Sequence, residues 1–180
     1  ALAFLGLKPN SKDEADLQKA GDLLASITPY VQKFTSSEYI NALANGDICV
    51  AVGYSGDVLQ ARNRAEEAKN NVNIGYFIPK EGALIWFDSF AIPADAPHKD
   101  EALAFINFML DPKIAARNSD YVAYASGSKD AQPLIDKEII DDPSVYPKAE
   151  TFEKLFTTTP NDPKVQRIVT RLWTKIKSGS

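Results

Sequence analysis

Residues 48–57 read Ile-Cys-Val-Ala-Val-Gly-Tyr-Ser-Gly-Asp. The first five residues form a continuous apolar run, which is typical of a buried strand. Two glycines then bracket a turn, and beyond it Val58, Ala61, Ala65 and Ala68 repeat at helical spacing. A buried strand that turns directly into a helix is a unit of layered α/β architecture, so this stretch predicts an α/β fold.

Further elements are expected on both sides of this stretch. Ser11 and Glu14 have the spacing of a capping box, which predicts a helix that ends before Pro29. A second helix is expected from about Ser37 to Gly46. The remaining expectations are strands at 72–78 and 83–92, a helix at 99–110, helices opening at Asp111-Pro112 and Asp162-Pro163, and a polar loop from Ser119 to Pro133.

The composition is that of a globular protein. Of the 180 residues, 44% are hydrophobic and 24% are charged, which argues against disorder. The net charge of −4 argues against a nucleic-acid binder, which would show a basic face. Cys49 and His98 are the single cysteine and the single histidine, so we expect no intrachain disulfide, no metal site and no cofactor. We expect Cys49 to be a buried structural thiol.

Two short segments place an aromatic ring close to a carboxylate. Tyr54 lies three residues before Asp57, and Trp86 lies two residues before Asp88. A carboxylate neutralises an ammonium ion, and an aromatic face attracts the same cation while covering apolar carbons. On a strand, Trp86 and Asp88 share one face and Phe87 points to the other. These segments therefore indicate a receptor for a small organic cation.

Structural explanations of the same residues stay open. Asp57 could cap the helix that follows it by accepting a backbone N–H. Trp86 could belong to the core, with Asp88 at a frayed strand end. Gly53 and Gly56 permit tight backbone geometry beside a ligand, but they also suit an ordinary turn.

A hydrolase is the alternative from another class. The order Ser55, Asp88, His98 matches the order of a hydrolase triad, and Ser55 sits between a strand and a helix as in a nucleophile elbow. The second glycine of that motif is displaced to Gly56, however, and His98 lies in a polar loop between Pro97 and Lys99. We expect Ser55 to hydrogen-bond the local backbone or a ligand, and we expect no enzyme.

Several segments resemble the second half of the bacterial periplasmic polyamine-binding proteins, above all the putrescine-binding members of the ABC importers. The resemblance extends over essentially the whole chain. It is carried by 40–47 (Ile-Asn-Ala-Leu-Ala-Asn-Gly-Asp), 53–57, 78–83 (Ile-Pro-Lys-Glu-Gly-Ala), 86–88 (Trp-Phe-Asp), 104–108 (Ala-Phe-Ile-Asn-Phe) and 171–177 (Arg-Leu-Trp-Thr-Lys-Ile-Lys).

The resemblance implies a ligand site made of carboxylates and aromatic rings. Asp57 and Asp88 would face the amines of the ligand, and Trp86 would cover its methylenes. Tyr124 matches a further aromatic member of the box. Tyr54 stands where relatives often have a tryptophan. Ser55 completes the set of expected ligand-binding residues.

The resemblance also implies a two-lobed fold of the type II solute-binding kind, of which this chain is the C-terminal portion. Residues 1–70 would complete the second lobe, 71–125 would return to the first, and 126–180 would form the C-terminal helical part of the second. The implied partners are a di- or polyamine, the membrane permease of an ABC importer in the periplasm, and the missing N-terminal half or a swapped copy. A fragment that serves as an interaction module without amine affinity is the remaining alternative.

Overall fold

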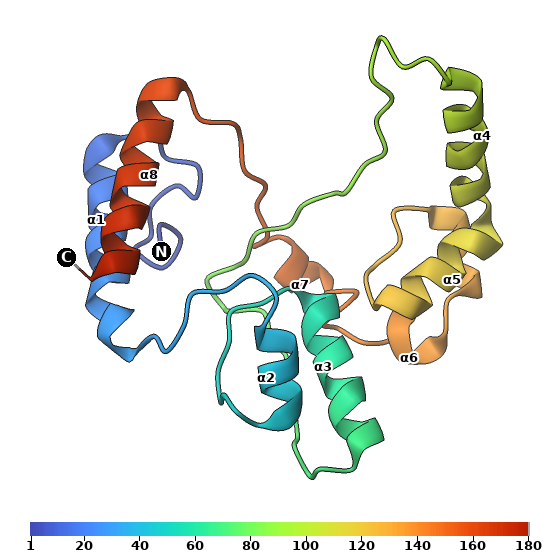
Figure 1. The fold of residues 1–180 in the computed structure, drawn as a ribbon, viewed down its shortest axis with the longest axis horizontal. Helices are drawn as coiled ribbons and strands as arrows, with labels where there is room; N and C mark the ends of the chain where they lie inside the picture. The colour runs from blue at the N-terminus through green and yellow to red at the C-terminus, as the bar shows by residue number, and fades with distance from the viewer. Residues whose placement is uncertain (180) are drawn as a thin grey trace. The chain divides into compact units, whose positions relative to one another are not determined.

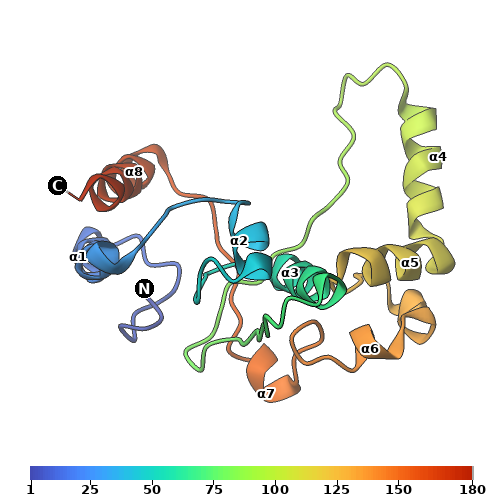
Figure 2. The same ribbon diagram turned by 60° about the horizontal axis from the view of Figure 1, so that its bottom comes forward.

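The computed structural model describes residues 1–179. Its helices are shown in Figures 1 and 2. Their bounds are α1 (Glu14–Ile27), α2 (Tyr39–Asn45), α3 (Ser55–Ala68), α4 (Lys99–Leu110), α5 (Pro112–Val122), α6 (Lys137–Ile140), α7 (Ala149–Phe152) and α8 (Pro163–Ser178), with 3₁₀ turns η1 (Thr28–Tyr30) and η2 (Lys129–Leu134). Between residues 1 and 179, no helix has both the length and the apolar character needed to cross a membrane.

The chain divides into two compact units. The first comprises Ala1–Thr35, Pro79–Trp86 and the residues from Glu153 on, and the second comprises Ser36–Ile78 and Phe87–Phe152. The predicted division at residues 70 and 125 stays a prediction.

In the first unit, α1 and α8 lie side by side (Figures 1 and 2). Gly21 permits their close approach, because a Cβ at that position would lie 3.2 Å from Leu172 Cδ2. Leu17 of α1 and Ile176 of α8 are buried. The apolar periodicity of these two helices therefore reflects their mutual packing.

In the second unit, α2 packs against α3 around a cluster of buried side chains. The cluster contains Tyr39, Leu43, Ala44, Val58 and Ala61, with Ile48, Ala51, Ile74 and Tyr76 packed against it. A neighbouring cluster of Leu59, Ala123 and Val145 connects α3 to the residue that follows α5. These two clusters fix α2, α3 and the end of α5 relative to one another.

The expected helices are confirmed, and local capping explains several of their ends. α4 covers the predicted range, and Asp111 caps α5 by accepting from the backbone N–H groups of Lys113 and Ile114. Gly46 ends α2 in the left-handed conformation, with φ 78°. The predicted capping box of Ser11 and Glu14 is wrong: Asp13 caps α1 by accepting from the backbone N–H groups of Ala15 and Asp16, and Ser11 donates to the side chain of Asp16.

The strand predictions are wrong for the described part of the chain. Residues 48–52, 72–78 and 83–92 contain no regular strand, and the bridge between Leu84 and Phe156 is isolated. A strand needs a second backbone to complete its hydrogen bonds along several residues. Among residues 1–179, only Phe156 provides such bonds to these segments: its carbonyl accepts from the Ile85 N–H at 2.9 Å, and its N–H donates to the Ala83 carbonyl at 3.1 Å. The expected α/β layers are therefore replaced by helices joined by extended segments.

Residues 48–52 are consequently covered only in part. Ile48 and Ala51 pack against the α2–α3 cluster, but Val50 and Val52 are 87% and 101% exposed. Cys49 is exposed as well, so the prediction of a buried thiol is wrong. The polar loop expected at 119–133 is also too long, since α5 continues to Val122 and η2 begins at Lys129.

Candidate functional site

Each of the two oxygens of the Asp57 carboxylate accepts a hydrogen bond from a tyrosine hydroxyl. Asp57 lies in the first turn of α3, where the helix dipole favours a negative charge. Tyr39 donates from Oη to Oδ2 at 2.5 Å, and Tyr124 donates from Oη to Oδ1 at 3.3 Å. The N-cap of α3 is Tyr54, without a side-chain capping bond, so the explanation of Asp57 as a helix cap is wrong.

Tyr39 is the first residue of α2 and is almost fully buried, at 5% exposure. Its hydroxyl accepts a hydrogen bond from the backbone N–H of Tyr54 at 3.2 Å. Burial and, next to it, the hydrogen bond to Asp57 together raise the pKa of Tyr39 to about 12, against the lowering effect of the Tyr54 N–H. The phenol is therefore protonated at neutral pH and available as a donor.

Tyr124 is positioned by the end of α5. Ala123 takes the left-handed conformation there, with φ 55°, and the buried Ser119 Oγ donates to the Tyr124 carbonyl. Burial raises the pKa of the Tyr124 phenol, and the negative charge of Asp57 adds to this effect. Tyr124 thus faces Asp57 as a second protonated phenol.

The two glycines of the 53–57 turn provide the space for these rings. A Cβ on Gly53 would lie 2.5 Å from Cε2 of Tyr39, and a Cβ on Gly56 would lie 2.2 Å from Cε2 of Tyr124. Neither distance is compatible with a real Cβ, so any side chain at these positions would displace a ring. Glycine is needed at both positions because a side chain would not fit. Backbone conformation does not require it, since neither glycine has a positive φ.

The Asp57 carboxylate has neutral donors and no cationic partner among residues 1–179. The arginines of α3 are engaged elsewhere: Arg62 pairs with Asp142 at 3.6 Å, and Arg64 donates to Asn41. A partly buried carboxylate that is hydrogen-bonded but not charge-neutralised is suited to an external cation. Such a site can bind an ammonium group.

The other predicted residues lie in separate segments of the described chain. Tyr54 directly precedes α3 and is 49% exposed, and Ser55 is the first residue of that helix. Trp86 belongs to the first unit and is 41% exposed. Asp88 lies exposed in the second unit, and within residues 1–179 no hydrogen bond or ion pair joins it to Asp57. The roles of Ser55, Trp86 and Asp88 stay predictions.

The three residues of the hydrolase alternative, Ser55, Asp88 and His98, are not joined by hydrogen bonds in the described part of the chain. His98 precedes α4, has a side chain that is 79% exposed, and lies with Nδ1 3.8 Å from Oε1 of Glu101. In the part of the chain that the structure describes, no hydrogen bond joins His98 to Ser55 or to Asp88. The residues between 1 and 179 also contain no cluster of three or more His, Cys, Asp or Glu side chains able to hold a metal.

Tyr39 is the site residue that sequence reasoning missed. A signal was present, because Tyr39 and Leu43 lie four residues apart on the apolar face of α2. A tyrosine on a buried helix face needs a partner for its hydroxyl. The sequence does not indicate which partner, since Asp57 is 18 residues away.

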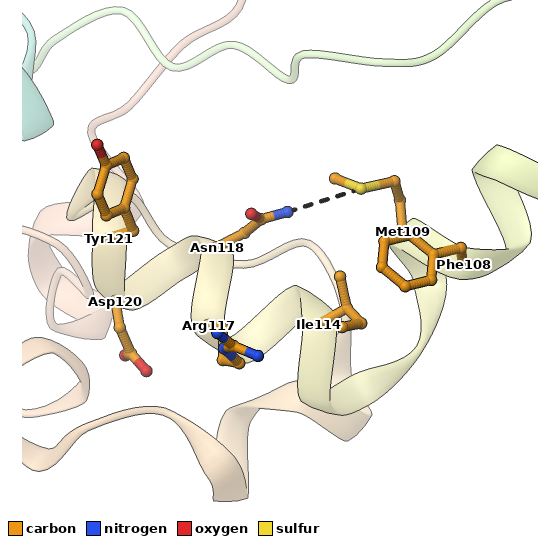
Figure 3. A pocket seen from close by; sticks show the side chains of 7 residues that line it. All are labelled: Phe108, Met109, Ile114, Arg117, Asn118, Asp120 and Tyr121. Atoms are coloured by element: carbon orange, nitrogen blue, oxygen red, sulfur yellow. Dashed lines mark hydrogen bonds between the residues drawn. The ribbon is translucent and has the colours of Figure 1, made fainter.

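A separate hollow of about 760 Å³ lies between α4 and α5 (Figure 3). Its lining consists of Phe108, Met109, Ile114, Arg117, Asn118, Asp120 and Tyr121. Asn118 Nδ2 lies 3.9 Å from the Met109 sulfur, and the Asp120 carboxylate accepts from the backbone N–H of Asp136. The hollow contains none of the predicted ligand-binding residues.

The comparisons with known proteins place these features in context. The model of the bacterial extracellular solute-binding protein family matches residues 1–147. The chain is 53% identical over 179 residues to the putrescine-binding periplasmic protein PotF of Escherichia coli K12, covering 99% of this chain and 48% of PotF. It is 51% identical over 179 residues to the putrescine-binding periplasmic protein SpuD of Pseudomonas aeruginosa, covering 99% and 49%.

A solved structure shares the fold. The spermidine/putrescine ABC transporter substrate-binding protein PotD of Streptococcus pneumoniae matches with a TM-score of 0.78 and 32% identity, over 99% of this chain and 53% of that one. The chain spans about half the length of the curated relatives it matches.

Proposed function

Because this chain belongs to the bacterial extracellular solute-binding proteins, we propose that it binds putrescine or a related di- or polyamine as part of an ABC importer. The family confirms the predicted resemblance, and the relatives are named as binding proteins rather than enzymes. The names of these relatives give no support to the hydrolase alternative for Ser55.

The observation that carries the proposal is the Asp57 carboxylate, which is framed by the two phenols of Tyr39 and Tyr124 and lacks a cationic partner in the described chain. One primary ammonium of the ligand would form an ion pair with this carboxylate. The Tyr54 ring, next to the same turn, would cover the adjacent methylenes. Ser55 would offer a hydroxyl to the ligand or to the local backbone.

A diamine carries a second charge, and Asp88 is the proposed carboxylate for it. Trp86 is the proposed aromatic wall along the hydrocarbon chain. Because the chain spans about half the length of its relatives, we propose that it supplies about half of the site, with the rest contributed by residues outside it. The whole protein would act in the periplasm and deliver its ligand to a membrane permease.

Isothermal titration calorimetry of the complete protein tests this function. Putrescine and spermidine are expected to bind with micromolar or tighter affinity. Butylamine, with one ammonium, is expected to bind much more weakly, and 1,4-butanediol, with none, is expected to give no heat. The proposal is refuted if putrescine and spermidine both give no binding heat and no thermal shift.

The predicted strand-like alternation at 86–88 gives a second test. Asp88→Ala is expected to weaken putrescine binding by about tenfold or more, because one ammonium loses its counter-charge. Phe87→Leu, at the neighbouring position, is expected to change the affinity by less than about threefold, since the proposed alternation would direct Phe87 away from the ligand. Equal losses in calorimetry would mean that this segment presents the opposite side to the ligand.

A further inference from the structure

We infer that Tyr39 is a positioning residue for amine binding: it holds the Asp57 carboxylate and the backbone of the 53–54 turn in one fixed arrangement, without touching the ligand. This inference rests on the proposed function. It assigns a role to a side chain that lies inside the protein, beneath the turn that carries Tyr54.

The direction of the hydrogen bonds follows from the groups involved. A backbone N–H can only donate, so the Tyr54 N–H must use a lone pair of the Tyr39 hydroxyl. The single proton of that hydroxyl is then committed to Asp57 Oδ2. Tyr39 therefore connects the turn backbone to the carboxylate by two bonds of defined direction.

The Tyr39 ring is buried and packed on several sides. It packs in the cluster with Leu43, Ala44 and Val58, and the place of a Cβ on Gly53 lies 2.5 Å from its Cε2 atom. Tyr124 differs, since it is only half-buried and its bond to Asp57 is longer, at 3.3 Å. Of the two phenols, Tyr39 is thus the more rigidly held.

A carboxylate on its own can rotate about its side-chain bonds before a ligand arrives. Fixing it in the binding orientation removes an ordering cost from the binding step. Tyr39 occupies one acceptor position of Oδ2 and Tyr124 occupies one of Oδ1, out of about four such positions on a carboxylate. The free acceptor positions of the carboxylate therefore keep a fixed orientation toward an incoming ammonium.

The test removes only the hydroxyl. Tyr39→Phe in the complete protein keeps the ring in its place and is expected to weaken putrescine binding about tenfold. Tyr76→Phe is the matched control, because Tyr76 packs against the same cluster and its pKa is raised by burial alone. The control is expected to bind putrescine like the unaltered protein.

Two further measurements separate positioning from a general effect on the fold. In an Asp57→Asn background, Tyr39→Phe is expected to cause no additional loss of residual affinity, because its effect passes through the carboxylate. Without ligand, the ¹³Cζ NMR signal of Tyr39 is expected to shift on Asp57→Asn, and that of Tyr76 is not.

The outcomes are distinct. If the unaltered protein binds putrescine and Tyr39→Phe binds it equally well, the inference is wrong and the proposed function stands. An equal loss in both backgrounds, or an unchanged Tyr39 signal, also overturns the inference. A failure of the unaltered protein to bind any amine refutes the proposed function itself.

Discussion

Asp57→Asn is expected to weaken putrescine binding by about a hundredfold or more. The substitution keeps the size of the side chain and removes its negative charge, so the ammonium of a bound ligand would be desolvated without a counter-charge. Loss of one partner of a desolvated ion pair costs about 2–5 kcal/mol, which corresponds to about thirtyfold to several thousandfold in affinity. No described cation would be left unpaired in the variant, because none pairs with Asp57.

The matched control is Asp47→Asn. Asp47 is exposed, lies ten residues before Asp57 and contacts the neighbouring Asn45 side chain at 3.4 Å. Asp47→Asn removes the same charge from the protein without altering the Asp57 carboxylate, so putrescine affinity is expected to change by no more than about twofold. If both variants lose affinity equally in calorimetry, the effect of Asp57 is one of overall charge and the proposed contact is wrong.

Gly56→Ala is expected to destabilise the protein, although the same change in most helices stabilises it. Alanine is favoured over glycine within a helix by about 1 kcal/mol. At this position, however, the new Cβ would lie 2.2 Å from the Tyr124 ring. The ring must move, and such overpacking typically costs about 1–3 kcal/mol. Displacing Tyr124 also removes its hydrogen bond to Asp57, so putrescine binding is expected to fall about tenfold.

Thermal unfolding and calorimetry check this prediction together. Gly75→Ala is the control, since nothing lies within 4 Å of the place of its Cβ. In a Tyr124→Ala background the clash is absent, and Gly56→Ala is expected to be neutral or stabilising there. A melting temperature raised by Gly56→Ala with Tyr124 intact would contradict the close packing of ring and glycine.

The helices of this protein could be predicted because the interactions that define them are local. α4 occupies the predicted residues, and Asp111 with Pro112 begins α5 as expected. A capping side chain bonds to backbone groups two or three residues away, and helical bonds span four. These interactions are complete within a short stretch of chain.

The strands could not be predicted in the same way. Residues 48–52 have the composition of a buried strand, yet Val50 and Val52 are exposed and no described backbone pairs with them. Apolar β-branched residues indicate that a segment can lie in a sheet, but the hydrogen bonds come from another segment. The exposure of Cys49 has the same cause.

By itself, the sequence determined where α1–α5 and α8 lie, placed Asp57 just after an apolar run at the start of a helix, and identified the family through its aromatic and acidic segments. Only the tertiary structure decided which groups surround the carboxylate. Tyr39 and Tyr124 lie 18 and 67 residues away from Asp57 along the chain, and they reach it because α2 and the end of α5 pack against α3. Contacts over such separations depend on the shape of packed side chains, here on two glycines that lack a Cβ, and no local pattern encodes that shape.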